Sequence, residues 1–454
     1  MTQLVKRLSL IEAVGLSLAI VAPTLTAAFN VSLVVRSAGP AAPLGFLIAA
    51  LATGFVALSF IGFSRRVAHA GAAYAYITHT FGARIGFVAG WALALAYVMF
   101  GSSMAALLGS FTVAALRSLG VATPAGLWII VSVLGILVAW ALSARDMRLA
   151  GRLMLTIEGL AVLAILYLCY RIFLAAPPTV DAVQAALTPS PTYDSWKGIG
   201  IAMVFCVLSF AGFESATTLG EEAVNPRRVI PIALFGSVAL CALFFALVAY
   251  AEIIGFGFAH LSTLASSEAP LDELSQRYAS RGLSVALDLA AAITCFSGTI
   301  GAINAGGRIF FALGREGLSR TLSYVHPRFG APTRATTLSA LIIAVPILAF
   351  GRGVIPGDLY GYTSTVAVLA LILNYMGVGL AEMVESLREG RRLWAFACAL
   401  GPLLLAWVGL RTVLPVPEWP SNLLPYITLA WVLLALPLLH LKPALRNARV
   451  GRLD

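Results

Sequence analysis

Residues 209–215 read Ser-Phe-Ala-Gly-Phe-Glu-Ser and place a glycine and a carboxylate in the middle of a long apolar stretch. A second interruption lies near the start of the chain, where residues 17–24 read Ser-Leu-Ala-Ile-Val-Ala-Pro-Thr. Glycine and proline both disfavour a continuous helix, so each stretch predicts a helix that breaks midway. A break leaves amide N–H groups and carbonyls unpaired, which favours a binding site for a charged small molecule.

The composition around these stretches is that of a membrane protein. The chain has 454 residues, of which 60% are apolar and only 11% are charged, whereas soluble domains are about 25% charged. A mean hydropathy of +0.93 excludes a soluble globular domain, a disordered chain and a disulfide-stapled secreted domain. A membrane-crossing helix takes about 20 residues, and the apolar windows predict an all-α protein with twelve of them. They are residues 10–35, 41–63, 85–113, 125–143, 153–174, 198–219, 230–254, 284–312, 335–351, 357–380, 394–413 and 423–441.

The placement of basic residues predicts the orientation. If the N-terminus is cytoplasmic, 22 of the 30 Lys and Arg residues fall on the inner side of these twelve spans and eight fall on the outer side. Cytoplasmic loops carry the excess of Lys and Arg, so the split predicts a multi-pass protein of the cell (inner) membrane with both termini in the cytoplasm. The net charge of +10 is therefore mostly a topology signal, and no nucleic-acid partner is expected.

The two breaks lie in the first and sixth spans, five spans apart. This spacing predicts two five-helix repeats of opposite orientation, because an odd number of spans makes the second copy enter from the other side. The repeats would cover residues 10–174 and 198–380 of one transmembrane domain, and residues 394–441 would form two additional helices. The plainer alternative is that Pro23 is an ordinary kink and Gly212 a packing residue.

Three segments resemble motifs of the amino acid–polyamine–organocation (APC) superfamily of permeases. Residues 212–231 begin Gly-Phe-Glu and end Glu-Glu-Ala-Val-Asn-Pro-Arg-Arg-Val-Ile-Pro, and residues 304–332 contain Gly-Arg-Glu-Gly and Val-His-Pro-Arg-Phe-Gly-Ala-Pro. Residues 70–91 contain Ala-Gly-Ala-Ala-Tyr-Ala-Tyr and Gly-Trp. The resemblance covers the first ten predicted helices and implies the LeuT-type fold, with the last two helices peripheral.

The resemblance also implies where a substrate lies, between the first, third, sixth, eighth and tenth helices. The first-helix break departs from the glycine-rich pattern common in the superfamily; Pro23 lacks an N–H, so contacts to a substrate carboxylate are expected from Thr24 and Leu25. Phe210 or Phe213 would act as an aromatic gate. Tyr97 would offer a hydroxyl from the third helix, or be an ordinary core or lipid-facing aromatic. The implied substrate-binding residues are Ala22, Pro23, Thr24, Tyr97, Phe210, Ala211, Gly212 and Phe213.

Three of the acidic residues in or near the spans, Glu214, Glu252 and Asp288, have ordinary interpretations. Glu252 and Asp288 fall near the outer ends of their spans and are expected to be solvated. Glu214 follows the second break, and we expect it to accept hydrogen bonds from loosened amides and so support the half-helix. The alternative, a counter-charge for a cationic substrate, would indicate a carrier of basic amino acids or polyamines.

Glu158 is the acidic residue with the strongest functional signal. It lies six residues into its span, roughly 9 Å deep at 1.5 Å per residue, where an unpaired carboxylate is costly. Some proton-coupled members of the superfamily carry a lysine in this neighbourhood of the fifth helix, in the space of a sodium ion, whereas this chain has a glutamate. A carboxyl removed from water at this depth suits a group that loads and unloads a proton. A neutral glutamic acid bonded to a backbone carbonyl is the alternative. Ser297 and Thr299 would either bind sodium or bond within their own helix.

These observations predict a secondary active transporter that moves amino acids by alternating access, with proton symport as the expected coupling. Polyamine transport or amino acid exchange within the same superfamily is the alternative. The expected partners are a small-molecule substrate and the bilayer, with no cofactor other than a proton or sodium as coupling ion. Arg308, Arg315 and residues 221–228 would either form an ion-pair gate on the cytoplasmic side or only anchor the topology.

Two other classes of protein fit less well. A membrane-embedded enzyme would need converging intramembrane nucleophiles, histidines or metal ligands, and the five histidines lie in loops or at span ends. The five cysteines are far apart in apolar runs without any C-x-x-C, which favours buried hydrophobic side chains over a metal site or disulfides. A sensor or scaffold that has lost transport is the third possibility.

Overall fold

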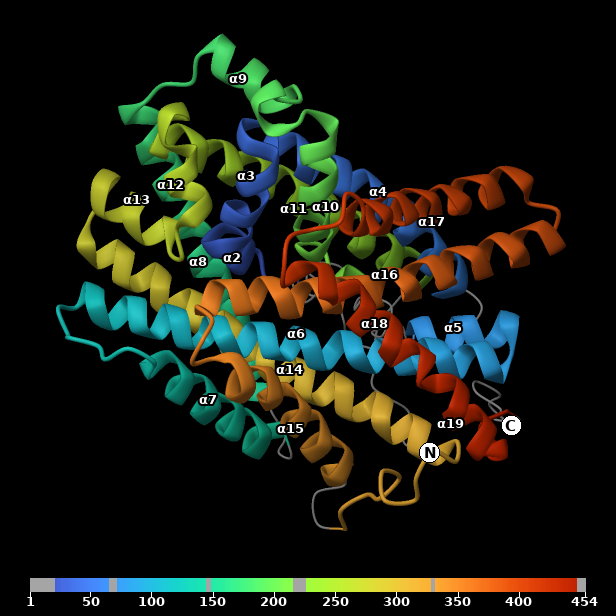
Figure 1. The fold of residues 1–454 in the computed structure, drawn as a ribbon. Helices are drawn as coiled ribbons and strands as arrows, with labels where there is room; N and C mark the ends of the chain where they lie inside the picture. Colours follow the sequence, from blue (N-terminus) through green and yellow to red (C-terminus); the bar gives the residue numbers. More distant parts are fainter. Residues whose placement is uncertain (1–20, 65–71, 144–147, 215–225, 328–330, 447–454) are drawn as a thin grey trace.

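The computed structural model describes residues 21–64, 72–143, 148–214, 226–327 and 331–446, and every regular element within these ranges is a helix (Figure 1). Among these residues, nine helical stretches are long and apolar enough to cross a membrane, and Leu127–Ser143 and Trp196–Leu208 are shorter apolar helices. The first stretch, Pro23–Ser64, contains the end of the first predicted span and all of the second. Within the described residues, each of the twelve predicted windows therefore contains helix.

The helix bounds follow the apolar windows closely, usually extending them by a few residues. In the described part of the first span, the short helix α2 (Pro23–Leu25) is followed by a π-helix (Thr26–Asn30) and α3 (Val31–Ala38). The other spans are α4 (Ala42–Ser64), α6 (Ala83–Ser118), α7 (Leu127–Ser143), α8 (Arg148–Ala175), α10 (Trp196–Leu208), α11 (Pro226–Phe256), α14 (Arg281–Arg315), α15 (Thr333–Phe350), α16 (Pro356–Arg388), α17 (Arg392–Val413) and the pair α18 (Leu424–Leu433) and α19 (Ala435–Leu441).

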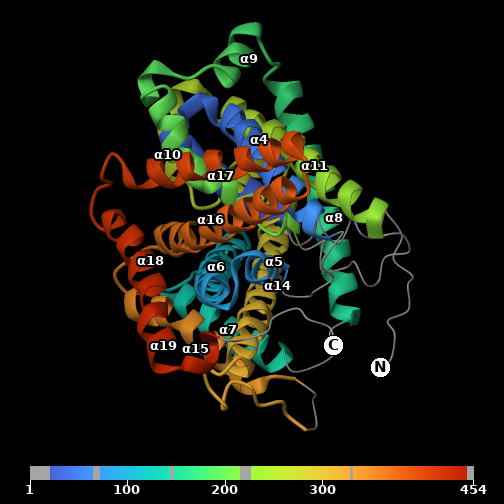
Figure 2. The same cartoon turned by 90° about the vertical axis from the view of Figure 1, so that its right-hand side faces the viewer.

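Four short helices lie outside these spans: α5 (Ala72–Phe81), α9 (Val180–Leu187), α12 (Leu261–Ser266) and α13 (Pro270–Tyr278). Helices α12 and α13 lie at one end of the bundle and α5 and α19 at the other (Figure 1). We call these the α13 end and the α5 end. Seen from the α5 end, α6 lies at the centre of its half of the bundle, between α16 and α7 and beside α14 (Figure 2).

Small residues allow the helices around α6 to approach closely, as is common in membrane bundles. A methyl group on Gly109 of α6 would lie 2.3 Å from the carbonyl oxygen of Trp128 at the start of α7. The last span is joined to α6 by a tryptophan pair: Trp91 and Trp431 stack with ring centroids 4.7 Å apart, and each indole N–H donates to the other residue's carbonyl. All five cysteines are buried, as predicted.

The prediction that Glu252 and Asp288 are solvated is wrong. Their relative exposures are 1% and 3%. The segment between α11 and α14 folds back over the ends of both helices: α13 packs on α8, α11 and α14, and the Tyr278 hydroxyl donates to the carbonyl of Gly255 at 2.8 Å. A position near the end of a span in sequence is therefore covered by protein here, because the connecting segment is itself folded.

Candidate substrate site

The first helix breaks where the sequence predicts. Ala22 precedes α2 with a left-handed φ of 55°, a conformation that is uncommon for residues other than glycine. Pro23 follows at the first helical position, which it tolerates because the first turn of a helix has unpaired N–H groups in any case. The break therefore exposes the N-terminal, amide-donating end of the helix that continues through α3.

The amide donors of this end are already used within the protein. Pro23 has none, and the Thr24 N–H donates to Oε1 of Glu158 at 2.8 Å. The Leu25 N–H donates to the carbonyl of Ala22 at 3.0 Å, and the Thr26 N–H donates to that of Pro23. The contacts that we expected Thr24 and Leu25 to make with a substrate carboxylate are thus taken in this structure by Glu158 and by Ala22.

Glu158 links three helices at the break. Its second carboxylate oxygen, Oε2, accepts a hydrogen bond from the Thr294 hydroxyl of α14 at 2.6 Å. The side chain is buried, with 8% exposure, and within the described part of the chain no ion pair involves it. A carboxylate at a helix N-terminus is stabilised by the amide dipoles. Glu158 lies beside the first break, as predicted. Its backbone partner is the N–H of Thr24, whereas the alternative interpretation of a neutral glutamic acid expected a backbone carbonyl.

The second break has a similar internal brace. Helix α10 ends at Leu208, and Gly212 adopts φ 99°, which glycine accepts at no steric cost. Oε2 of Glu214 accepts hydrogen bonds from the Gly212 N–H at 3.1 Å and from the Tyr375 hydroxyl of α16 at 2.7 Å. The contact expected for Glu214 with a loosened amide is present. Tyr97 of α6 lies close enough to Glu214 to interact with its charge.

The two aromatic candidates for a gate are packed into the walls of the bundle. Phe210 is fully buried and makes an edge contact with Phe245 of α11, with centroids 5.2 Å apart. Phe213 is also buried and makes edge contacts with Phe60 of α4 and Tyr375 of α16. Ala22, Ala211 and Gly212 are partly exposed beside these rings, whereas Pro23 and Thr24 are buried.

The hydroxyls of α14 are used differently from the expectation for sodium ligands. Thr299 donates to the carbonyl of Cys295 at 2.9 Å within its own helix, the more common use of such a hydroxyl. Ser297 is partly exposed. Thr294, one turn earlier, is the residue that reaches Glu158, and sequence reasoning missed it. The sequence signal for Thr294 was that it lies close to the other hydroxyl residues of this helix, Ser297 and Thr299.

A second missed group joins the two breaks near the α13 end. The Asn30 side chain, from the π-helix, donates to the Ser209 hydroxyl at 2.9 Å and accepts from the Tyr360 hydroxyl of α16 at 2.6 Å. All three side chains are buried. The sequence signal for this group was the amide side chain of Asn30 in the middle of an apolar span. Its two partners lie 179 and 330 residues away along the chain, and nothing in the sequence indicated that they would meet Asn30.

The α13 end is closed above this group by polar contacts. Arg36 of α3 lies 3.6 Å from Asp358 of α16 and donates to the carbonyl of Ala265 in α12. Glu268, between α12 and α13, accepts a hydrogen bond from the Gly357 N–H at the start of α16 at 3.2 Å. These contacts connect the first helix, the tenth helix and the folded segment over them.

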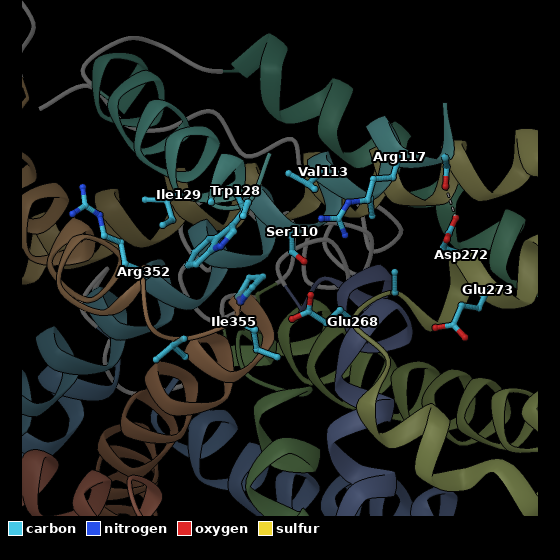
Figure 3. A pocket seen from close by; sticks show the side chains of 18 of the residues that line it. Ser110, Val113, Arg117, Trp128, Ile129, Glu268, Asp272, Glu273, Arg352 and Ile355 are labelled. Atoms are coloured by element: carbon cyan, nitrogen blue, oxygen red, sulfur yellow. Dashed lines mark hydrogen bonds between the residues drawn. The ribbon is translucent and has the colours of Figure 1, made fainter. Parts of the chain in front are cut away.

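A cavity of about 980 Å³ opens beside Glu268, between the ends of α6, α7, α13 and α16. Figure 3 shows the side chains of Arg117 and Glu268 reaching into this cavity from opposite sides. None of the residues predicted to bind substrate lines it. Burial raises the pKa of the Glu268 carboxyl and Asp358 adds to the effect, while the Gly357 N–H and the Arg117 guanidinium oppose it.

Replacing Glu268 with glutamine is expected to stabilise the closed α13 end at neutral pH. A raised pKa means that the closed arrangement disfavours the ionised carboxyl, so wild-type stability falls as the pH rises through the ordinary range of a glutamate. Glutamine keeps an acceptor for the Gly357 N–H and carries no charge. The melting temperature of the variant should exceed that of wild type at about pH 8, and the difference should vanish near pH 4. Glu273→Gln, at an exposed position, is the control and should show no such trend.

Residues 70–91 and 304–332, two of the segments that resemble superfamily motifs, meet at the α5 end. The hydroxyl of Tyr74 in α5 donates to Oε1 of Glu316, which follows α14. Burial raises the pKa of Glu316, while the Tyr74 hydroxyl and Arg315 lower it. The acidic residues of the expected ion-pair gate, Glu221 and Glu222, lie outside the described residues, so that gate stays a prediction.

Comparisons with known proteins agree with this geometry. A sequence model described as amino acid permease matches residues 8–436. The branched-chain amino acid permease BcaP of Lactococcus lactis subsp. cremoris is 29% identical over 327 residues, which is 69% of each chain. The cationic amino acid transporter 4 of Homo sapiens is 28% identical over 326 residues, or 68% of this chain and 49% of that protein.

The fold also matches solved structures. A mutant of the manganese transporter of Eremococcus coleocola superposes with a TM-score of 0.62 at 14% identity, covering 96% of this chain and 95% of that one. The predicted all-α, LeuT-type transporter fold is therefore confirmed, and the relatives are transporters rather than enzymes. By its sequence match and its fold, the chain belongs to the amino acid permease family of the APC superfamily.

Proposed function

We propose that this permease takes up an amino acid together with a proton across the cell membrane, with both of its termini in the cytoplasm, and that Glu158 binds the coupling proton. The observation that carries the proposal is the pair of hydrogen bonds that join Glu158 to Thr24 at the first break and to Thr294 of α14. The first helix is one of the elements that rearrange in alternating access, so a proton on Glu158 changes a contact that transport must break.

The substrate class that we favour is neutral amino acids of the branched-chain type. Two permeases named for these substrates are among the relatives, from Lactococcus lactis and from Bacillus subtilis. Glu214, the carboxylate that would attract a cationic substrate, already accepts hydrogen bonds from Gly212 and Tyr375. Competition for labelled leucine uptake by excess leucine but not by excess arginine would support this class.

Basic amino acids are the second candidate, because several relatives are named cationic amino acid transporters. Under this alternative, arginine is the stronger competitor, and Glu214→Gln abolishes arginine uptake while sparing leucine uptake. An amino acid exchanger would show uptake only into vesicles preloaded with substrate.

Replacing Glu158 with glutamine is expected to remove the pH dependence of uptake into proteoliposomes. Glutamine keeps an oxygen to accept from the Thr24 N–H, so the break remains supported, but it cannot titrate. Wild-type uptake should rise severalfold between about pH 8 and pH 5.5, and the variant should show a flat profile. The matched control is Glu252→Gln, which alters another buried carboxylate that makes no contact with the break. An unchanged profile in the Glu158 variant would refute the assignment.

A further inference from the structure

The amide-donating end of the first break has a single outward donor, and a carboxylate of the protein already occupies it. The N–H groups of Leu25 and Thr26 bond to carbonyls of the same turn, which leaves only Thr24 to donate, and it donates to Glu158. We infer, on the basis of the function proposed above, that Glu158 fills the carboxylate subsite while the transporter is empty and that the carboxylate of the amino acid displaces it.

The subsite has the donors that one carboxylate needs. Each oxygen of Glu158 accepts one bond, from the Thr24 N–H at 2.8 Å and from the Thr294 hydroxyl at 2.6 Å. The hydroxyl of Thr24 is a further donor: it is buried beside the Glu158 carboxyl but makes no hydrogen bond of standard geometry among the described residues. An incoming carboxylate would pair it fully, which favours binding.

The surroundings do not support two carboxylates at once. Among the described side chains, the titratable groups that face Glu158 are the thiols of Cys241 on α11 and Cys295 on α14, and α2 contributes no charged side chain. Where no described cation balances them, two carboxylates sharing a buried site do not both remain ionised. Glu158 therefore takes up one proton from water as the substrate carboxylate arrives. It changes from carboxylate to carboxylic acid, and no other bond is made or broken.

This exchange makes the substrate itself the trigger for proton binding. Amino acid and proton then bind with positive coupling, and by reciprocity each increases the affinity for the other. The same exchange selects for substrates with a free carboxylate. An amine that lacks it cannot take the place of Glu158 at Thr24 and has no reason to cause proton uptake. The inference thus points away from polyamines as substrates of this site.

The test measures binding and proton uptake in purified protein, separately from transport. Twenty amino acids are first screened by thermal shift, and the tightest binder is compared with its decarboxylated amine by titration calorimetry in buffers of different ionisation enthalpy. At about pH 8, we expect close to one proton taken up per amino acid bound, and an affinity that falls about tenfold per pH unit at higher pH. The amine should bind without proton uptake.

Variants make the assignment specific. Glu158→Gln should bind the amino acid with no proton uptake and with pH-independent affinity, whereas Glu252→Gln, the control, should behave as wild type. Proton uptake that persists in Glu158→Gln, wild-type binding without proton uptake, or failure of all twenty amino acids to bind would overturn the inference.

The outcome can be separated from that of the proposed function. If Glu158-dependent proton uptake accompanies binding but a pH gradient does not drive transport, symport is wrong and the displacement stands. If Glu158→Gln flattens the pH profile of transport but amino acid binding takes up no proton, symport stands and the displacement is wrong.

Discussion

Replacing Asn30 with leucine is expected to shift the transporter away from the closed arrangement of the α13 end. The substitution keeps a similar volume but removes two buried hydrogen bonds, to Ser209 and from Tyr360, which hold the first helix to α10 and α16. Each such bond contributes about 0.5–1.5 kcal/mol, so the equilibrium between closed and open forms should shift by about 1–3 kcal/mol, or roughly 5- to 150-fold.

Hydrogen exchange of backbone amides measures this shift directly. Amides of α3 and α12 should exchange faster in the Asn30 variant, because both elements cover the α13 end. Tyr360→Phe removes one of the two bonds and should give about half of the free-energy change. Ser32→Ala is the control in the same span, since the Ser32 hydroxyl is buried and has no hydrogen-bond partner in the described part of the chain. Equal protection in the Asn30 and Ser32 variants would show that this group does not hold the end closed.

Replacing Gly307 with alanine is expected to lower the stability of the protein. A methyl group there would lie 2.9 Å from Cα and 3.1 Å from the backbone N of Thr336, where α14 crosses the start of α15. Backbone atoms cannot move aside as a flexible side chain can, so the two helices must separate. Overpacking of this kind costs about 1–3 kcal/mol. The melting temperature of the detergent-solubilised protein, compared with wild type, measures the cost.

Gly301, two turns earlier on the same helix, provides the matched control. A methyl group on Gly301 would meet no atom within 4 Å. Its replacement by alanine should be neutral, or stabilising by up to about 1 kcal/mol through helix propensity alone. If the two variants melt at the same temperature, close packing at Gly307 does not limit stability.

The fold was predictable from the sequence because the bilayer restricts it so strongly. Backbone groups must be paired within each span, which makes every apolar window a helix, and the charges between windows mark where each helix ends. The windows 85–113 and 284–312 correspond to α6 (Ala83–Ser118) and α14 (Arg281–Arg315), each longer than expected. Hydropathy detects the apolar middle of a helix and misses polar turns that extend beyond it.

The site was predictable only in part. The breaks and the neighbourhood of Glu158 followed from local chemistry: a proline, a glycine and a carboxylate at membrane depth. The partners did not, because which hydroxyl of α14 reaches Glu158 depends on how two helices are rotated against each other. Periodicity alone does not separate Thr294 from Ser297, which lies about one turn away. The burial of Glu252 was missed for a related reason, since hydropathy does not show that a polar connecting segment folds back.

The π-helix of residues 26–30 determines which way each end of the first span faces. The Val31 N–H donates to the carbonyl of Thr26, so this turn holds one residue more than an α-helical turn. Each residue of a helix adds about 100° of rotation. Deleting one residue here would keep the hydropathy of the span unchanged, yet rotate Asn30 by roughly that angle relative to the Thr24 amide. A relative with a one-residue gap between residues 24 and 30 could not make the contacts of both Thr24 and Asn30 in the same way. An alignment gap at this place therefore indicates a differently arranged site, even between proteins of similar overall sequence identity.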